Sequence, residues 1–201
     1  MKTALIVHGY GLGQSDWEYT MWGDVGRGLL GRIPTALLLI DRRHPDLIIW
    51  NTGSTEKDGM REGDYILQHT LTNLGKLPFL HKELQRIDPL WLKDDIRKVS
   101  ITETYSKRTS ESLEIALPLL IKRGKPIFDE VMQVTSKNHA SRVLRDSLSI
   151  WWEKHQAMIM TSIYPAQTGY AGGTAGEVQI TELVSDKRVP FDTERVAALI
   201  K

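Results

Sequence analysis

The most informative part of this sequence is Val131-Met132-Gln133-Val134-Thr135-Ser136-Lys137-Asn138-His139-Ala140-Ser141-Arg142. The stretch begins as a mainly apolar run, passes through two hydroxyl residues, and leads into apolar residues with helical spacing. This order predicts a buried strand from Val131 to Thr135 and a helix from about Asn138 to Trp152. At such a junction the free backbone N–H groups of the helix face a crevice and can bind an anion.

Two side chains of this stretch indicate chemistry. His139 and Arg142 are three positions apart, so both can face the same crevice. An imidazole titrates near neutrality, which makes His139 a candidate general acid/base. Arg142 can neutralise a phosphate or carboxylate that Ser136 and backbone N–H groups also bind. The alternatives are a structural histidine and an arginine that only pairs with Asp146, four positions later.

Further apolar runs and helical patterns alternate along the chain. The other expected strands of the sheet are Ala4–Val7, Asp46–Trp50, Val99–Ile101 and Met158–Ile163. The other expected helices are Val25–Ile40, interrupted near Pro34; Met60–Leu74; Thr109–Leu120, kinked or shortened by Pro118; and Thr193–Ile200. This alternation predicts a three-layer, Rossmann-like α/β domain with a mainly parallel sheet of about five strands.

We expect a single domain over residues 1–201. Residues 76–95 are expected to be a helical insertion. Residues 165–201 are expected to be a divergent C-terminal segment, which contains a glycine-rich loop at Gly169–Gly176 and a sixth strand at Val178–Leu183.

The composition limits the possible partners and the cellular location. The formal net charge of +1 gives no global field that would attract nucleic acid or an anionic membrane. The chain has no cysteine, which excludes disulfides, thiolate nucleophiles and Cys-based zinc sites. The N-terminal apolar run is too short for a signal peptide, and no apolar window approaches the ~20 residues that span a bilayer. We therefore expect a cytoplasmic protein whose partner is a small molecule.

Polar and glycine residues also follow the first two expected strands. Gly9 and Gly11 allow a ligand to approach the backbone closely, although their spacing is not that of a dinucleotide fingerprint and also suits a plain tight turn. Thr52 and Gly53 follow a strand and could contact a phosphate or ribose hydroxyls. Glu62 comes later in the sequence. The alternative there is an ordinary loop in which Glu62 complements a helix N-terminus.

The segment after the third expected strand contains charged and hydroxyl residues. Glu103 directly follows the strand, and Lys107 and Arg108 come soon after it. Capping of the next helix is a sufficient explanation for Thr109 and Glu111, but not for the three charged residues at the strand end.

Several familiar catalytic motifs are absent from the sequence. It contains no G-x-S-x-G nucleophile elbow, no P-loop and no H-E-x-x-H motif. The six histidines are scattered without metal-ligand spacing, so no metal site is expected.

With these segments in order, residues 3–165 resemble the YdcF-like family of bacterial proteins (the YdcF/SanA/ElyC-like domain). The matching positions are Gly9 and Gly11; Thr52, Gly53 and Glu62; Glu103, Ser106, Thr109 and Glu111; and Thr135, Ser136, His139 and Arg142. Two departures stand out: Asn51-Thr52-Gly53 replaces the usual Ser-Gly-Gly, and Ser112 stands where the family commonly has Asn.

The resemblance implies a Rossmann-like fold with a polar pocket at the carboxyl ends of the strands, and nucleotide-like ligands that include S-adenosylmethionine. We therefore expect a transferase or hydrolase that acts on a nucleotide-like or phosphorylated ligand. His139 is the expected general acid/base, and Glu103 the partner base or a group that orients the ligand. The remaining matched residues are expected to bind the ligand. The alternatives are a non-catalytic module that binds S-adenosylmethionine or a nucleotide, and a divergent hydrolase with Ser136 or Ser106 as nucleophile.

Overall fold

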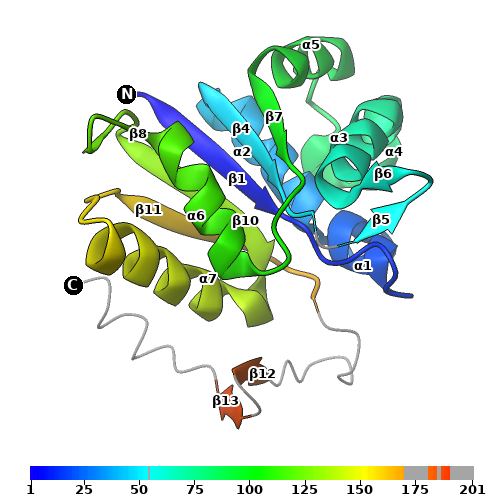
Figure 1. The fold of residues 1–201 in the computed structure, drawn as a ribbon. Helices are drawn as coiled ribbons and strands as arrows, with labels where there is room; N and C mark the ends of the chain where they lie inside the picture. The colour runs from blue at the N-terminus through cyan, green and yellow to red at the C-terminus, as the bar shows by residue number, and fades with distance from the viewer. Residues whose placement is uncertain (54, 170–180, 185–186, 191–201) are drawn as a thin grey trace.

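A five-stranded parallel sheet forms the centre of the computed structural model, which describes residues 1–53, 55–169, 181–184 and 187–190 (Figure 1). The strand order is β11-β10-β1-β4-β7. The strands are β1 Thr3–His8, β4 Leu47–Asn51, β7 Ser100–Glu103, β10 Glu130–Ser136 and β11 Thr161–Ala166. The prediction of a Rossmann-like α/β fold with a parallel sheet is confirmed.

Helices cover both faces of this sheet, because successive strand residues point to opposite sides. Leu5 and Val7 of β1 pack beneath helices α2 (Arg32–Arg43), α3 (Glu62–Asn73) and α5 (Pro89–Val99). Ala4 and Ile6 pack on the other face, beneath α6 (Thr109–Leu120) and the segment formed by α7 (Ala140–Ser147) and a π-helical continuation (Leu148–Lys154). The short apolar strand runs are thus explained by burial on both faces.

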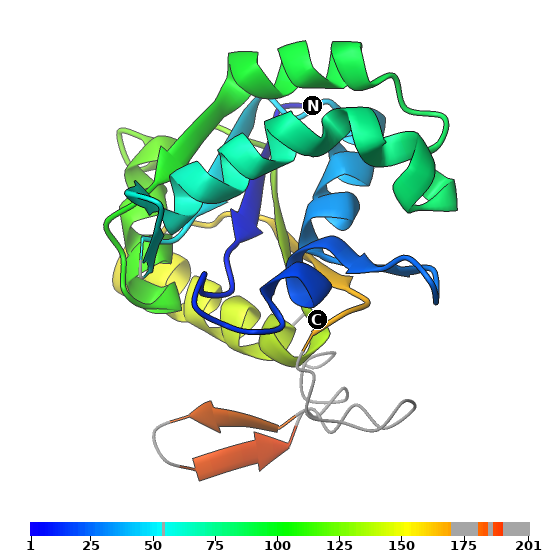
Figure 2. The same ribbon diagram turned by 90° about the vertical axis from the view of Figure 1, so that its right-hand side faces the viewer.

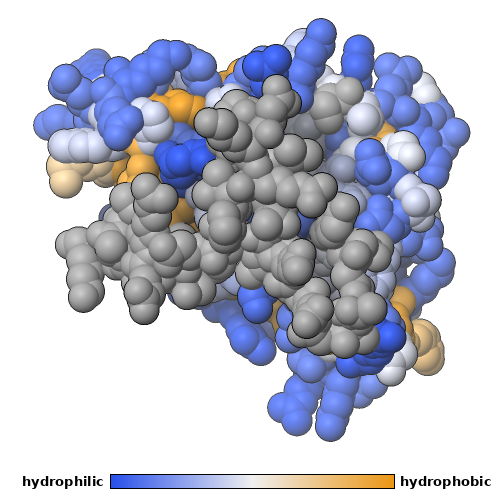
Figure 3. All heavy atoms as spheres, turned by 90° about the horizontal axis from the view of Figure 1, so that it is seen from below, coloured by the Kyte–Doolittle hydropathy of each residue, from blue (hydrophilic) through white to orange (hydrophobic). Residues whose placement is uncertain are grey.

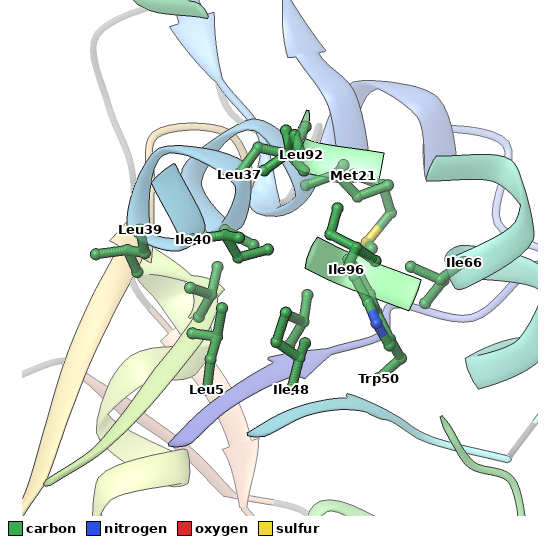
Figure 4. Packing of buried hydrophobic residues seen from close by; sticks show 14 of the residues in the cluster. Leu5, Met21, Leu37, Leu39, Ile40, Ile48, Trp50, Ile66, Leu92 and Ile96 are labelled. Carbon is green, nitrogen blue, oxygen red and sulfur yellow. The ribbon is translucent and has the colours of Figure 1, made fainter. Parts of the chain in front are cut away.

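The larger of the two cores lies under α2, α3 and α5. Figure 4 shows Ile48 and Trp50 of β4 directed toward Ile66 of α3 and Ile96 of α5. Trp50 is fully buried, and its indole N–H donates to Ser100 Oγ at 2.8 Å. A buried tryptophan therefore keeps its one donor satisfied.

The chain changes direction once within the sheet. From β1 it moves to β4 and then β7 on one side, and then returns to β10 and β11 on the other. The switch therefore falls between β1 and β10, and parallel sheets of this kind bind ligands in the crevice beyond the strand ends at that point. Figure 2 shows the loops and helix ends that gather around this edge of the sheet.

Smaller elements complete the described chain. They are helices α1 (Trp17–Trp22) and α4 (Leu77–Leu80), the 3₁₀ turns Leu74–Lys76, Lys82–Leu84 and Lys137–His139, and the hairpins β2 (Gly23–Asp24) with β3 (Leu29–Leu30), β5 (Glu56–Lys57) with β6 (Met60–Arg61), β8 (Ile121–Lys122) with β9 (Lys125–Pro126), and β12 (Thr181–Val184) with β13 (Lys187–Pro190). No helix within the described ranges is both long and apolar enough to cross a bilayer. On the face drawn in Figure 3, the described residues in view are mostly hydrophilic.

The helix expected from Val25 begins later than predicted, at Arg32. Glycines precede it, and the β2–β3 hairpin is closed by Asp24, whose carboxylate accepts from Arg27 N at 3.0 Å. Pro34 does not interrupt the helix, because it lies in the first turn, where its missing N–H has no intrahelical partner to lose.

Two other boundaries also differ from the prediction. The last strand of the sheet begins at Thr161 rather than Met158, because the chain leaves the π-helical segment through a left-handed residue, Gln156 (φ 53°), and pairs with β10 only from Thr161 onward. The expected insertion at 76–95 contains α4 and the first part of α5, which continues to Val99.

The expected C-terminal elements are only partly described. The sixth strand was expected at Val178–Leu183; β12 overlaps its end, but pairs antiparallel with β13 outside the main sheet. The predicted helix Thr193–Ile200 and almost all of the predicted loop Gly169–Gly176 lie outside the described residues.

Gly63 provides a test of the contact between α3 and the sheet. A Cβ at this buried position would lie 2.6 Å from Glu103 O and 2.8 Å from Trp50 O, both of them backbone atoms. We expect Gly63→Ala to lower the free energy of unfolding by about 1–3 kcal/mol, despite the better helix propensity of alanine. Gly75→Ala is the matched control, because its Cβ would meet nothing within 4 Å. Equal urea midpoints for the two variants would contradict this packing.

Candidate functional site

A polar cavity of about 490 Å³ lies at the switch point, beyond the carboxyl ends of β1, β4 and β10. Its walls come from the loop after β1, the starts of α2, α3 and α6, and the segment that enters α7. The residues that line it are His8, Gly9, Tyr10, Gly11, Arg32, Asn51, Thr52, Glu62, Lys107, Arg108, Thr109, Ser110, Ser112, Asn138, His139, Arg142 and Asp146.

Buried hydrogen bonds fix the protonation of His8 at the end of β1. Gln133 of β10 donates its amide N–H groups to Ser147 Oγ at 2.9 Å and Thr161 Oγ1 at 2.8 Å, so its oxygen faces His8. His8 Nε2 lies 3.0 Å from that oxygen and must therefore carry the proton. His8 Nδ1 is left as an acceptor, 3.4 Å from Asn51 Nδ2.

The pKa of His8 is consistent with this neutral ring. Burial lowers it from 6.5 to about 4, and the charges of Arg32 and Arg142 act in the same direction, while the bond to Gln133 opposes them. His8 is only 3% exposed and therefore stays neutral at physiological pH.

Three side chains surround the imidazole of His139. Arg142 Nη2 lies 2.5 Å and Thr109 Oγ1 3.2 Å from Nε2, while Thr135 Oγ1 lies 3.1 Å from Nδ1. A guanidinium can only donate, so Nε2 must be the acceptor and the proton must be on Nδ1, which donates to Thr135. Burial, and next the charges of Arg32 and Arg142, lower the pKa of His139 well below 6.5. His139 is thus a neutral imidazole whose Nε2 accepts from Arg142.

Glu62 closes the glycine loop that follows β1. It is fully buried, and its Oε1 accepts from the backbone N–H groups of Tyr10 and Gly11, both at 2.6 Å. Its Oε2 accepts from Thr55 Oγ1 at 2.9 Å. Gly9 is required here, because a Cβ would lie 2.4 Å from the Glu62 carboxylate. These are the N–H groups that would bind phosphate in a dinucleotide-binding loop, and an internal carboxylate already occupies them.

Glu103 does not reach the cavity, so its expected role as partner base or ligand-orienting group is wrong. Its carboxylate turns back into its own loop, where it accepts from Tyr105 N at 2.7 Å, Ser106 N at 2.8 Å and the Ser106 hydroxyl. Glu111 likewise accepts from Lys107 N at 2.8 Å, as in a capping interaction. Two carboxylates that were expected to contact a ligand thus hold the two ends of the loop between β7 and α6.

The predicted site residues divide into two groups by their place relative to the cavity. The cavity is lined by Gly9, Gly11, Thr52, Glu62, Thr109, His139 and Arg142. The residues outside its lining are Gly53, Glu103, Ser106, Glu111, Thr135 and Ser136. Thr135 still contacts His139, whereas Gly53 allows the backbone of the loop after β7 to approach, since a Cβ there would lie 2.0 Å from Thr104 O.

Arg32 is the principal cavity residue that sequence reasoning missed. It is 2% exposed, donates from Nε to Ser136 Oγ at 2.8 Å, and donates from Nη1 to the backbone oxygens of His8 and Gly9. A signal was present, because Arg32 falls on the same helical face as the apolar Ala36 and Ile40, where an arginine needs buried partners.

Positive charge predominates around the cavity. Its lining contains four cationic side chains, Arg32, Lys107, Arg108 and Arg142, and two carboxylates, Glu62 and Asp146. Both carboxylates have partners: Glu62 accepts backbone N–H groups, and Asp146 pairs with Arg145 at 3.0 Å. Within the described residues, no group of three or more His, Asp or Glu side chains could hold a metal ion.

Comparison of the chain with protein-family models, with curated proteins and with solved structures finds no match in any of the three. The residues and geometry of the cavity therefore carry the functional argument.

The buried histidine predicts a specific loss of stability in acid. Because unfolded His8 binds a proton that folded His8 excludes, stability should fall as the pH drops from 6.5 toward 4, by about 3 kcal/mol from this residue alone. In His8→Gln, which retains a donor toward Gln133, urea unfolding at stepped pH should show a correspondingly smaller loss. His155→Gln, which replaces a partly exposed histidine, is the control. Parallel stability curves for wild type and His8→Gln would rule out this contribution.

Proposed function

We propose that this protein is a small-molecule enzyme of the YdcF-like type, which binds a nucleotide-like or phosphorylated ligand at the carboxyl edge of the sheet and uses His139 as its proton-transfer group. The observation that carries the proposal is the excess of cations around a cavity at the topological switch point. Its volume of about 490 Å³ suits a ligand of nucleotide size.

The two departures from the family pattern support the resemblance. Asn51 stands where the family commonly has Ser, and Ser112 where it commonly has Asn. In the structure, Asn51 Nδ2 donates to Ser112 Oγ at 2.9 Å. The two positions at which the chain departs from the family pattern therefore contact each other, and together they hold one Asn and one Ser, as the pattern does.

Thr52 gives a second point of support. Its φ of 140° lies in a region that favours glycine, and glycine is the residue that the family pattern has at this position. Hydrogen bonds hold the strained residue on both sides, from Thr52 N to Glu103 O at 3.2 Å and from Gly63 N to Thr52 O at 2.8 Å.

The phosphate is assigned to the side of the cavity between α6 and α7. On the opposite side Glu62 already accepts the N–H groups of the glycine loop. Thr109 and Ser110 begin α6, whose N-cap residue Arg108 makes no side-chain capping bond, so the helix presents donors and a positive dipole to the cavity. Arg108 and Arg142 supply charge beside them.

Arg142 links ligand binding to the activity of His139. An incoming phosphate competes for its guanidinium, because a charge-assisted bond to an anion is stronger than a bond to a neutral imidazole. Movement of Arg142 uncovers Nε2 of His139, and the bound phosphate places a negative charge nearby. Both changes raise the pKa of His139. The imidazole then takes a proton at Nε2 from a water or hydroxyl as its oxygen forms a bond to the phosphorus, and returns that proton to the leaving oxygen as the bond between this oxygen and the phosphorus breaks.

A non-catalytic binding module is the second candidate, favoured by one observation: Nε2 of His139 already accepts from Arg142. For either function a nucleotide is preferred to S-adenosylmethionine, because a sulfonium cation would meet the four cations of the lining. A serine hydrolase is disfavoured, because Ser136 Oγ is bonded to Arg32, the Ser106 hydroxyl is bonded to Glu103, and neither serine lines the cavity.

Removal of one cavity cation should weaken the binding of an anion. We expect Arg142→Gln to lower the affinity for adenosine 5′-monophosphate by about ten- to a hundredfold, measured by calorimetric titration. Lys98→Gln removes the same charge from an exposed position beside the amino end of β7 and should leave the affinity unchanged. Equal losses of affinity in both variants would mean that only the total charge of the protein matters, and would contradict the assigned site.

The proposed displacement of Arg142 predicts a coupled titration. In wild type the pKa of His139, followed by NMR of its ring protons, should rise when sulfate, a non-titrating phosphate analogue, replaces chloride at equal ionic strength. In Arg142→Gln the pKa should already be higher without sulfate, because a lowering charge has been removed. If sulfate binds and stabilises the protein but leaves the His139 titration unchanged, the proposed role of His139 in proton transfer is wrong.

A further inference from the structure

A buried acceptor at the end of β4 has no partner in the described part of the chain. It is Oδ1 of Asn51, a residue that lines the cavity and is only 1% exposed. Buried polar atoms in folded proteins are nearly always hydrogen-bonded, so an exception on a ligand cavity indicates a bond that the ligand completes.

The neighbours of Asn51 determine which end of its amide remains unbonded. Ser112 Oγ donates to Thr109 O at 2.8 Å and therefore accepts from the group that faces it, Asn51 Nδ2, at 2.9 Å. The same amide nitrogen faces the unprotonated Nδ1 of His8. If the amide were turned over, its oxygen would face two acceptors, so the assignment of oxygen and nitrogen is fixed by the network.

The amide group of Asn51 contacts the start of α6, where the phosphate is proposed to bind, through its bond from Nδ2 to Ser112 Oγ. Ser112 follows Thr109 on the first turn of α6, and Thr109 Oγ1 is 3.2 Å from Nε2 of His139. We infer that Asn51 Oδ1 accepts a hydrogen bond from a hydroxyl of the ligand, so that the ligand joins its phosphate to a sugar or polyol. This inference rests on the proposed function and specifies its substrate class.

The charge of the surroundings favours an uncharged donor, such as a hydroxyl. A protonated amine would enter a cavity that contains Arg32 and Arg142, whose charges already lower the pKa of His8 next to Asn51. A hydroxyl supplies a donor without a charge. The ribose of a nucleotide carries such hydroxyls near its phosphate.

The test compares two ligands that differ only in these hydroxyls, adenosine 5′-monophosphate and its 2′,3′-dideoxy analogue. Calorimetric titration of the full chain should show that wild type binds the ribose form at least about tenfold more tightly, as expected when a buried acceptor loses its donor. The reciprocal variant Asn51→Ser/Ser112→Asn keeps the pair of side chains but moves the amide to α6. It should bind both ligands with the affinity that wild type has for the dideoxy form.

The outcomes separate this inference from the proposed function. Equal binding of both ligands by wild type would mean that water satisfies Asn51, and would overturn the inference while leaving the phosphate site intact. Failure of both ligands to bind would overturn the proposed function as well. The wild-type comparison decides the matter even if the reciprocal variant does not fold, and circular dichroism of that variant identifies such a case.

Discussion

A line of buried hydrogen bonds across four strands sets the chemistry of the cavity. It runs from Thr161 through Gln133 and His8 to Asn51, and ends at Ser112 on α6. Each member has one orientation that satisfies its neighbours. Turning one member over would leave buried polar atoms without partners and would destabilise the fold. The network therefore keeps His8 neutral and leaves the side-chain oxygen of Asn51 without a partner among the described residues.

Carboxylates shape the loops around this network. Glu62, Glu103 and Glu111 all accept backbone N–H groups of segments at the carboxyl edge of the sheet. Their carboxylates are thus engaged inside the loops, and most of the charged side chains that line the cavity are cationic. A formal net charge of +1 for the whole chain conceals this local excess.

The sequence predicts the sheet well, because its strands are short apolar runs buried on both faces and each ends in turn-forming residues. It also predicts that the strand ends converge, which places His139 and Arg142 correctly in one cavity. It does not predict which way a polar side chain turns at a strand end: the Glu103 carboxylate accepts from Tyr105 and Ser106 of its own loop, and only the backbone path reveals this. Arg32 was missed because its partners, two backbone oxygens and Ser136, are remote in sequence.

The most direct test of this account is a crystal structure of the protein with adenosine 5′-monophosphate. The phosphate should lie at the start of α6, in contact with Arg142 displaced from His139, and a ribose hydroxyl should lie within hydrogen-bonding distance of Asn51 Oδ1. A phosphate bound instead to the N–H groups of Tyr10 and Gly11, with Glu62 expelled, or a nucleotide bound outside the cavity, would contradict it.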